Sequence, residues 1–244
     1  MSGEWEARTE LLLGEEQMER IHKAKVLLVG VGGVGGYAAE MLVRSGVRHL
    51  SIIDMDEVQP TNINRQIIAL HSTIGKPKVE VWRDRLLDIN PALHLTAEQL
   101  FLRDELTDQL LASRPFDFVI DAIDTLSPKV HLIKSLVERE IPFISIMGMG
   151  AQFDPRLITI GRMDKAKNCS LARFIRKRLR KMGVSLKFPV VYSTELADDA
   201  AIQLTEGEAN KKSITGTIAH NPAVAGCYAA YAALDYITGR GTLS

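Results

Sequence analysis

A glycine-rich stretch follows the first apolar run of the chain and has the composition of a phosphate-binding loop. It reads Gly30-Val-Gly32-Gly33-Val-Gly35-Gly36. Because glycine has no side chain, backbone N–H groups in such a loop can approach a phosphate closely, and a helix that starts there adds a favourable dipole. Asp54 ends the next apolar run, where a carboxylate can accept hydrogen bonds from ribose hydroxyls. These features predict a nucleotide site that includes Gly30, Gly32, Gly33, Gly35 and Asp54.

The polar residues after Asp54 favour cleavage of ATP over the nicotinamide or flavin chemistry that a glycine loop alone would suggest. A dinucleotide site does not need so dense a polar run, whereas a site that splits ATP between its α- and β-phosphates does. Arg65 and Lys78 can stabilise charge that moves onto the departing pyrophosphate. Asp124, after a later apolar run, can hold Mg²⁺. The expected contacts to ATP also include Asp56, Asn62, Asn64 and Gln66.

Two of these residues also have a purely structural interpretation. Lys78 opens an expected helix and could be an ordinary solvated side chain. Asp124 could cap the helix that starts near Pro128. However, Lys78 and Asp124 occur together with Arg65 and the glycine loop, and such a combination is improbable by chance.

The elements that must position these residues alternate between apolar runs and amphipathic segments. The expected strands are 25–30, 49–54, 93–96, 116–122, 142–147, 158–160 and 190–193, and the expected helices are 34–45, 78–89, 103–112, 128–139, 171–182 and 223–234. This alternation predicts an α/β fold with a Rossmann-type, mostly parallel sheet and helices on both faces. The glycine loop and Asp124 would then lie at the carboxyl ends of strands, where open α/β sheets bind ligands.

We expect a single domain over residues 1–244. Its parts would be an N-terminal helical arm (1–24), a nucleotide-binding core (25–150) and a substrate-side extension (151–244). Residues 195–220 show no periodicity, and we expect them to form a mobile loop near the active site.

The composition fits a cytoplasmic enzyme. The chain has 244 residues, of which 46% are hydrophobic, and a formal net charge of zero, so it can bury one sizeable core. Two cysteines, Cys169 and Cys227, are too few for a disulfide framework or a zinc tetrad. The polar start of the chain is unlike a signal peptide. The most apolar late segment, 223–234, is too short to cross a bilayer, so we expect no membrane role.

On these motifs, the chain resembles the ubiquitin-activating-enzyme superfamily over roughly residues 5–150, in the bacterial branch that activates sulfur-carrier proteins. The resemblance implies that Gly33 and Asp54 bind the nucleotide, and that the run from Thr61 to Arg65, Lys78 and Asp124 complete the site. It also implies a homodimer, because Arg8, six residues before Gly14, matches an arginine that reaches the ATP of the other subunit. An ordinary exposed arginine remains the plainer interpretation of Arg8.

Further stretches are similar to those of one subgroup, the tRNA threonylcarbamoyladenosine dehydratases. They include Asp121-Ala-Ile-Asp124 with Pro128-Lys129, Gly148-Met-Gly150 and Ser193-Thr-Glu195. The subgroup implies that the threonyl carboxylate of a modified adenosine beside the anticodon attacks the α-phosphate of ATP. A nitrogen of the same substituent then closes a ring while AMP leaves, and proximity can favour that step by about 7–11 kcal/mol.

A basic segment independently favours a nucleic-acid partner. Residues 165–194 carry nine lysines or arginines and no acid, which leaves 21 basic against 30 acidic residues elsewhere. The expected helix 171–182 would place an apolar stripe, including Phe174 and Met182, on the protein and most basic side chains in water. Such a face suits a phosphate backbone, although a solvated helix face is the usual explanation of a charge run. The residues expected to contact tRNA are Arg173, Arg176, Lys177, Arg180 and Lys181.

Three other functions stay open at this point. The adenylated group could be the C-terminus of a ubiquitin-like sulfur carrier, although the chain lacks the paired CxxC motifs and the transfer cysteine common in such enzymes. The chain could instead be a nicotinamide-dependent oxidoreductase. It could also be a nucleotide sensor that binds ATP without releasing pyrophosphate.

Overall fold

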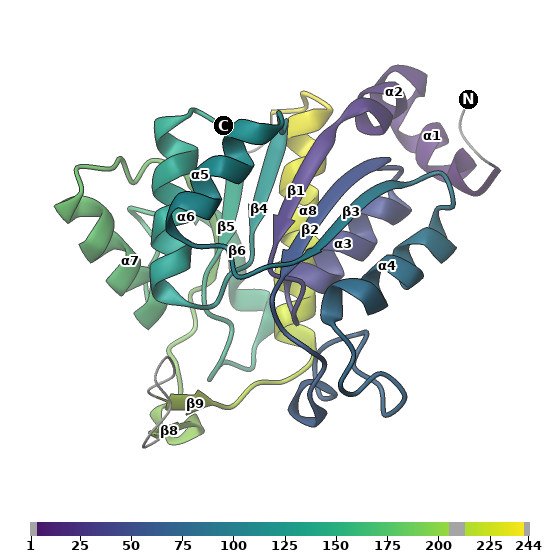
Figure 1. Ribbon diagram of the computed structural model, residues 1–244. Helices are drawn as coiled ribbons and strands as arrows, with labels where there is room; N and C mark the ends of the chain where they lie inside the picture. Colours follow the sequence, from purple (N-terminus) through teal and green to yellow (C-terminus); the bar gives the residue numbers. More distant parts are fainter. Residues whose placement is uncertain (1–3, 205–212, 242–244) are drawn as a thin grey trace.

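The computed structural model describes residues 4–204 and 213–241, and its centre is a seven-stranded sheet in the order β3-β2-β1-β4-β5-β7-β6 (Figure 1). All neighbouring strands are parallel except β6 and β7. The expected mostly parallel sheet is therefore confirmed. The strands are β1 Lys25–Val29, β2 His49–Asp54, β3 His94–Gln99, β4 Phe118–Asp121, β5 Phe143–Ile146, β6 Ile158–Arg162 and β7 Pro189–Ser193.

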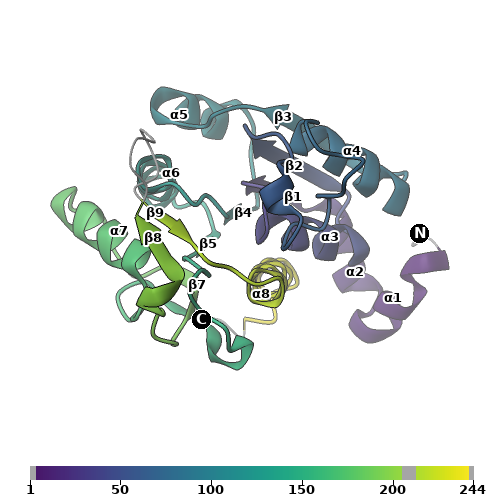
Figure 2. The same cartoon turned by 90° about the horizontal axis from the view of Figure 1, so that it is seen from below.

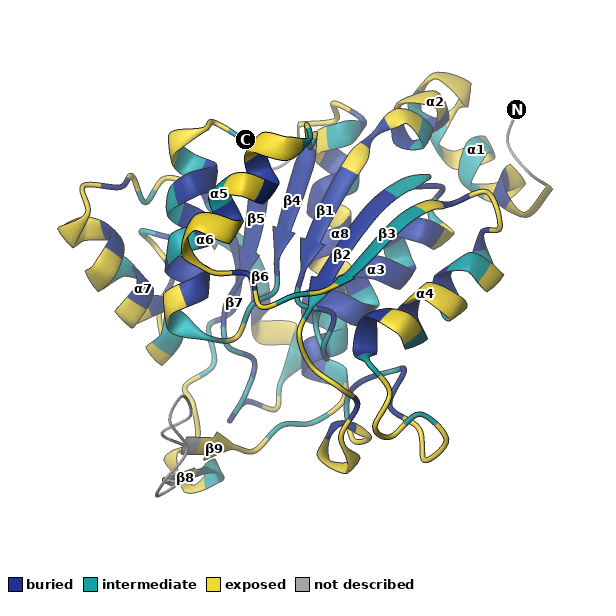
Figure 3. Cartoon of the chain, in the orientation of Figure 1, coloured by how far each residue is buried: buried dark blue, intermediate teal, exposed yellow. Residues whose placement is uncertain are grey.

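Helices cover both faces of the sheet (Figures 1 and 2). Along β1, Val26 and Leu28 belong to one hydrophobic cluster and Leu27 and Val29 to another, because successive side chains of a strand point to opposite faces. The first cluster is completed by α3 Gly35–Arg44, α4 Lys78–Ile89 and α8 His220–Ile237, and the second by α5 Asp104–Ser113, α6 Leu126–Glu138 and α7 Ser170–Lys181. The central strands are accordingly buried on both faces (Figure 3).

The direction of strand order changes between β1 and β4. From β1 the chain proceeds to β2 and β3 on one side, and from β4 it proceeds to β5 and β7 on the other. At such a switch point the loops after the two adjacent strands diverge and leave a crevice at their carboxyl ends. The glycine loop follows β1 and Asp124 follows β4, so both lie at this crevice.

The N-terminal arm is helical and consists of a short turn of helix, Glu4–Glu6, followed by α1 Ala7–Leu13 and α2 Glu15–Lys23. Gly14 separates them with a φ of 85°, outside the helical range. In the segment 195–220, a turn of helix at Asp199–Ala201 leads into two antiparallel strands, β8 Ile202–Leu204 and β9 Ser213–Thr215. The expectation of a loop without regular structure is wrong there, and residues 205–212 lie outside the described residues.

None of the helices in the described part of the chain combines the length and apolarity needed to cross a bilayer.

Candidate functional site

The glycine loop passes so close to neighbouring backbone that side chains would not fit. Gly30 has a φ of 89°, and a Cβ there would lie 2.7 Å from the carbonyl oxygen of Ala122, after β4. A Cβ on Gly35 would lie 1.8 Å from the carbonyl oxygen of Gly30. The loop therefore turns tightly into α3, whose N-terminus faces the crevice. This geometry offers backbone N–H groups and the positive end of a helix dipole to a phosphate.

Asp54 holds the start of this loop. Its Oδ2 accepts a hydrogen bond from the backbone N–H of Val31 at 2.7 Å, and its Oδ1 accepts one from that of Asp56 at 2.8 Å. Burial raises the pKa of the Asp54 carboxyl, against the lowering effect of nearby Lys78 and of the two N–H donors. Because a carboxylate has about four acceptor positions, Asp54 can still accept from ribose hydroxyls.

Lys78 is buried, so the solvated interpretation of this lysine is wrong. Only 4% of the residue is exposed. Its Nζ lies 2.8 Å from Asp56 Oδ2, and its backbone N–H donates to the carbonyl of Asp56. Asp56 thus holds the ammonium group at the N-terminus of α4. A cation is unfavourable at this positive end of the helix dipole, and the negative charge of Asp56 offsets that unfavourable interaction.

The turn after β2 brings the other predicted polar residues to the glycine loop. A Cβ on Gly33 would lie 3.3 Å from Arg65 Cγ, and one on Gly32 would lie 3.5 Å from Gln66 Nε2. Both side chains therefore lie against the glycine doublet. Gln66 is 6% exposed, and its buried Oε1 has no hydrogen-bond partner in the described structure. Since a buried polar atom rarely stays unpaired, this one suits a ligand in the crevice.

The two asparagines of the turn have partners within the protein. Asn62 is buried, and its Oδ1 accepts from the backbone N–H of Gln59, which closes the turn of helix Pro60–Asn62. Asn64 Nδ2 donates to the carbonyl of Thr217 at 3.1 Å, and Asn64 Oδ1 accepts from Arg65 Nη1 at 2.8 Å. Asn64 thus joins the nucleotide side of the crevice to the segment before α8 and orients Arg65.

The loop after β4 carries Asp124 and rests on a buried ion pair. Asp124 is exposed, and it does not cap α6, whose first turn lacks a side-chain cap. Lys129 Nζ lies 2.9 Å from Asp121 Oδ2, and neither side chain is exposed. Ser145 Oγ donates to the same oxygen at 2.6 Å, and the backbone N–H of Ile123 donates to Asp121 Oδ1 at 3.2 Å.

This buried pair was not assigned a role from the sequence. Burial lowers the pKa of the Lys129 amino group, and the carboxylates of Asp121 and Asp124 oppose that shift. The signal that could have revealed it is a lysine directly before the run Val130-His-Leu132-Ile133, most of which is apolar. A cation within an apolar helix face requires a buried partner.

The residues at this edge of the sheet are compatible with a magnesium ion. Among the described residues, no three His, Cys, Asp or Glu side chains are grouped as a metal site. Mg²⁺ commonly keeps several waters and uses one or two carboxylates together with substrate phosphates. One exposed carboxylate beside a phosphate loop meets that requirement, so Asp124 would hold the ion.

Arg8 lies far from the nucleotide crevice of its own chain. It is exposed and lines a hollow of about 370 Å³ with Ser45 and Thr238, which cap the C-termini of α3 and α8. The glycine loop lies at the N-termini of the same two helices, where a Cβ on Gly33 would lie 3.4 Å from Pro222. At about 1.5 Å per residue, α3 and α8 are about 15 and 27 Å long. Arg8 cannot span that separation.

Helix α7 presents a basic outer face. Arg173, Lys177, Arg180 and Lys181 are exposed, whereas Ala172, Ile175 and Leu179 are buried. Arg176 differs, because its Nη1 donates to the carbonyls of Ala166 at 2.7 Å and Met163 at 3.5 Å. The expectation that Phe174 and Met182 belong to the buried stripe is wrong. They are 47% and 53% exposed, and Phe174 lies under the guanidinium of Arg173.

Taken together, the crevice contains a phosphate loop with Arg65 and Lys78 beside it. Preorganised cations at such a place stabilise negative charge that develops on a leaving phosphate group. Asp54 offers hydrogen-bond acceptors to a sugar, and Gln66 lies against the glycine doublet. The arrangement is suited to nucleotidyl transfer from ATP.

Comparisons with known proteins agree with this chemistry. The chain is 41% identical over 189 residues to a tRNA threonylcarbamoyladenosine dehydratase of Bacillus subtilis, covering 78% of this chain and 74% of that protein. Its fold matches a crystal structure of the E. coli tRNA N6-threonylcarbamoyladenosine dehydratase in complex with ATP. That match has a TM-score of 0.85, 32% identity, and coverage of 96% of this chain and 93% of that one.

Sulfur-carrier chemistry has weaker support. A molybdopterin-synthase adenylyltransferase of Salmonella typhimurium is 35% identical, but over 130 residues that cover only 53% of this chain. Residues 7–244 match the model of the ThiF family. The chain therefore belongs to the ThiF family.

Proposed function

We propose that this protein is an ATP-dependent tRNA threonylcarbamoyladenosine dehydratase. The observation that carries the proposal is the extent of the similarity to dehydratases of this kind, which continues past the nucleotide-binding strands into the second half of the chain. Similarity to the sulfur-carrier enzymes covers about half the chain. We infer that the part of the chain without a match in the sulfur-carrier enzymes contributes to binding the substrate other than ATP.

The reaction has two steps. An oxygen of the threonyl carboxylate attacks the α-phosphorus of ATP, the bond to the bridging oxygen breaks, and pyrophosphate leaves. A nitrogen of the same substituent then attacks the activated carbonyl carbon, loses its proton, and expels AMP. The oxygen removed from the substrate leaves in AMP, so the net change in the RNA is loss of water.

The residues around the glycine loop would serve the first step. The backbone N–H groups of the loop and Gln66, which lies against it, would bind the phosphates, and Asp54 would bind the ribose. Arg65 and Lys78 would stabilise the charge on pyrophosphate, in a crevice where such interactions are stronger than in water. Mg²⁺ held by Asp124 would neutralise phosphate charge.

The tRNA and a second subunit would complete the assembly. The exposed basic residues of α7 would contact the RNA backbone. We expect the reaction to take place in the cytoplasm. Arg8 would act in the site of a partner subunit, since it cannot reach its own. Leu11 and Leu12, 89% and 76% exposed beside Arg8 on α1, support a covered surface there, because exposed apolar patches commonly mark interfaces.

The proposal is tested by mass analysis of anticodon-loop nucleosides. Purified protein is incubated with ATP and tRNA that carries the threonylcarbamoyl modification. We expect a product lighter by one water, formed only with ATP and accompanied by AMP and pyrophosphate. Pyrophosphate exchange that requires a ubiquitin-like protein and ignores tRNA would refute it.

A further inference from the structure

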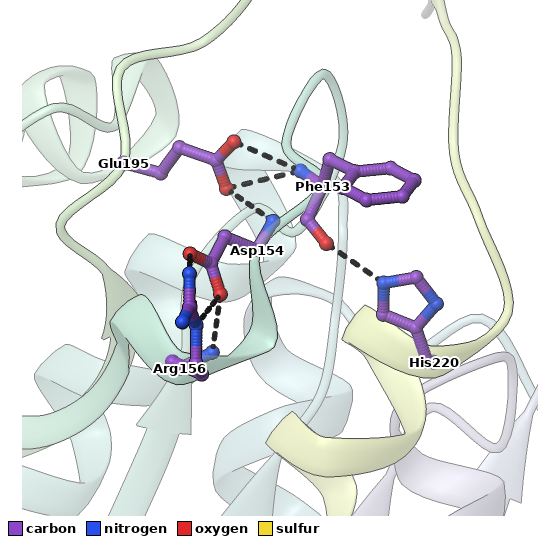
Figure 4. A network of polar contacts seen from close by, with 5 residues as sticks. All are labelled: Phe153, Asp154, Arg156, Glu195 and His220. Carbon is purple, nitrogen blue, oxygen red and sulfur yellow. Dashed lines mark hydrogen bonds and ion pairs between the residues drawn. The ribbon is translucent and has the colours of Figure 1, made fainter.

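An exposed aromatic ring stands on a firmly held backbone at the edge of the crevice. Phe153 is 67% exposed and belongs to the loop between β5 and β6. Its N–H donates to both carboxylate oxygens of Glu195, at 3.1 and 3.0 Å, and its carbonyl accepts from His220 Nε2 at 2.7 Å (Figure 4). A side chain on a backbone fixed at both sides loses little conformational entropy when it binds a ligand.

The ring itself is supported from one side. The rings of Phe153 and His220 meet edge to face, with centroids 5.4 Å apart and an interplanar angle of 90°. The base of the loop is held in addition by Gln152, whose carbonyl accepts from Asn221 Nδ2 at 2.8 Å and whose Nε2 donates to the carbonyl of Glu195 at 3.0 Å. The aromatic ring is therefore exposed because the loop presents it, not because the loop is loosely packed.

A short series of contacts connects the loop that carries Phe153 with the nucleotide site. Asn64 donates to the carbonyl of Thr217, and a Cβ on Gly150 would lie 3.4 Å from the Thr217 methyl group. Phe153 is three residues after Gly150. On the other side, His220 opens α8, where Pro222 lies against Gly33 of the phosphate loop.

The two acids in contact with the backbone of the loop, Asp154 and Glu195, have partners within the protein. Asp154 is paired with Arg156, whose Nη2 lies 2.7 Å from Asp154 Oδ2 and whose side chain is 87% exposed. The hydrogen bonds and charge of Arg156 lower the pKa of Asp154 to about 2. Glu195 is turned toward backbone N–H groups, including that of Asp154 at 2.9 Å. Asp154 is therefore directed toward Arg156 and Glu195 toward backbone N–H groups.

We propose that Phe153 is a stacking platform for the modified adenine of the RNA substrate. This inference rests on the proposed function. Proteins read single-stranded RNA by stacking unpaired bases on aromatic side chains. Because the carboxylate to be activated sits on a substituent of the base, the base must lie beside the nucleotide crevice while its substituent enters it. Phe153 occupies that position, and RNA backbone on α7 would approach from the same half of the sheet.

The test compares Phe153→Ala, Phe153→Leu and Phe153→Tyr in binding an anticodon stem-loop RNA that carries the modification, measured by fluorescence anisotropy at several salt concentrations. We expect Phe153→Ala to weaken binding by about 5- to 150-fold, the range for loss of one base–aromatic stack. Tyr should preserve affinity and Leu should not, because stacking needs a ring rather than apolar bulk. The dependence of affinity on salt and the affinity for ATP should stay as in the wild type, since no charge changes.

Phe101→Ala is the matched control, because Phe101 is 36% exposed and follows β3 at the opposite edge of the sheet. Thermal unfolding of each variant reports whether the loop still folds. Unchanged RNA affinity in Phe153→Ala would refute the proposal that Phe153 stacks on the base. An RNA affinity of Phe153→Leu equal to that of the wild type would refute it as well. A wild-type protein that binds the RNA through Phe153 but never dehydrates it would refute the proposed reaction instead.

Discussion

Lys78 is the residue whose position in the structure makes the sharpest prediction about rate. Its ammonium group is buried at the helix N-terminus and held by Asp56. Lys78→Ala should slow the ATP-dependent reaction about 10²–10³-fold, as expected when one preorganised group that stabilises developing charge is removed. The rate of pyrophosphate release under single-turnover conditions measures this loss.

Lys76→Ala provides the control, because Lys76 is exposed two residues earlier in the same turn. It should react at close to the wild-type rate. A Lys78→Ala protein that folds normally and retains near wild-type release of pyrophosphate would contradict the assigned role.

The buried pair of Asp121 and Lys129 leads to a prediction about stability. Lys129→Met leaves the Asp121 carboxylate in the core without its counter-charge, which should lower the free energy of unfolding by about 3–5 kcal/mol. Adding Asp121→Asn should recover much of that loss, because the remaining partners of Asp121 are the neutral Ser145 hydroxyl and the Ile123 N–H. Urea unfolding of the two single variants and the double variant measures the coupling. If Lys129→Met lowers the free energy of unfolding by less than about 1 kcal/mol, the buried ion pair does not stabilise the fold as expected.

At the scale of residues, the sequence predicted which side chains lie near the glycine loop better than it predicted their burial and hydrogen-bond partners. Arg65 and Gln66 lie against the glycine doublet, as a phosphate site requires, because strand ends that carry polar residues converge in a parallel sheet. The sequence could not show that Lys78 is buried or that Asn62 is committed to a backbone N–H, since burial depends on which distant segments cover a residue. Lys129 differs, because the apolar run that follows it already indicates a buried lysine.

At the scale of elements, α7 should contribute charge to RNA binding. Lys177→Glu with Arg180→Glu should weaken tRNA binding and reduce the slope of log affinity against log salt, by roughly one unit for each phosphate that the helix no longer neutralises. Arg83→Glu is the control, because Arg83 is an exposed arginine on α4, on the opposite face of the sheet. Titrations of labelled tRNA at several salt concentrations distinguish the outcomes. A slope unchanged in the α7 variant would show that this face is only solvated.

Helices α3 and α4 are joined by an ion pair that should depend on pH. Glu40 is 4% exposed and accepts from Arg85 Nε at 2.6 Å and Arg44 Nε at 2.8 Å. Burial alone would raise the pKa of Glu40, but the two arginines outweigh it, so the pKa lies below the ordinary 4.5. A carboxyl whose pKa is lowered by folding contributes stability above its unfolded pKa and loses it as the pH falls through the folded value.

Glu40→Gln should therefore reduce the free energy of unfolding by about 1–3 kcal/mol at pH 7, the range for a hydrogen bond to a charged group. The difference from the wild type should shrink below pH 4.5 as Glu40 itself takes up a proton. Denaturant unfolding of both proteins between pH 3 and pH 7 measures this difference. Glu16→Gln, which removes an exposed pair with Arg20, should change stability far less. An equal loss at pH 3 and pH 7 would show that packing rather than charge is responsible.

The arrangement of elements was predictable where periodicity is strong and local. The strands and helices between residues 25 and 147 follow from alternating apolar runs, although boundaries shifted by a few residues. The break at Gly14 was not foreseen, because one glycine in a helical pattern is tolerated as often as it ends a helix. The β8–β9 pairing was missed because strands of three residues carry no measurable period.

At the scale of the whole molecule, the site of one chain lacks the arginine that the family resemblance assigns to it. Arg8 lies at the C-terminal ends of α3 and α8, and the glycine loop lies at their N-terminal ends. If Arg8 serves catalysis, a second copy of the chain must bring it to the crevice. A dimer with two-fold symmetry does so twice, because each arm would extend to the partner's site.

Mixing two inactive variants tests this arrangement. Arg8→Ala and Lys78→Ala should each be inactive alone, since every site in either homodimer lacks one of the two cations. In the mixed dimer, the Arg8→Ala subunit keeps its own Lys78 and receives Arg8 from its partner, so one of the two sites is complete. Equal mixing with free exchange should restore about a quarter of wild-type activity, because half of the dimers are mixed and each has one complete site. Arg8 acting within its own chain would leave the mixture inactive, provided that native mass spectrometry detects the mixed dimer.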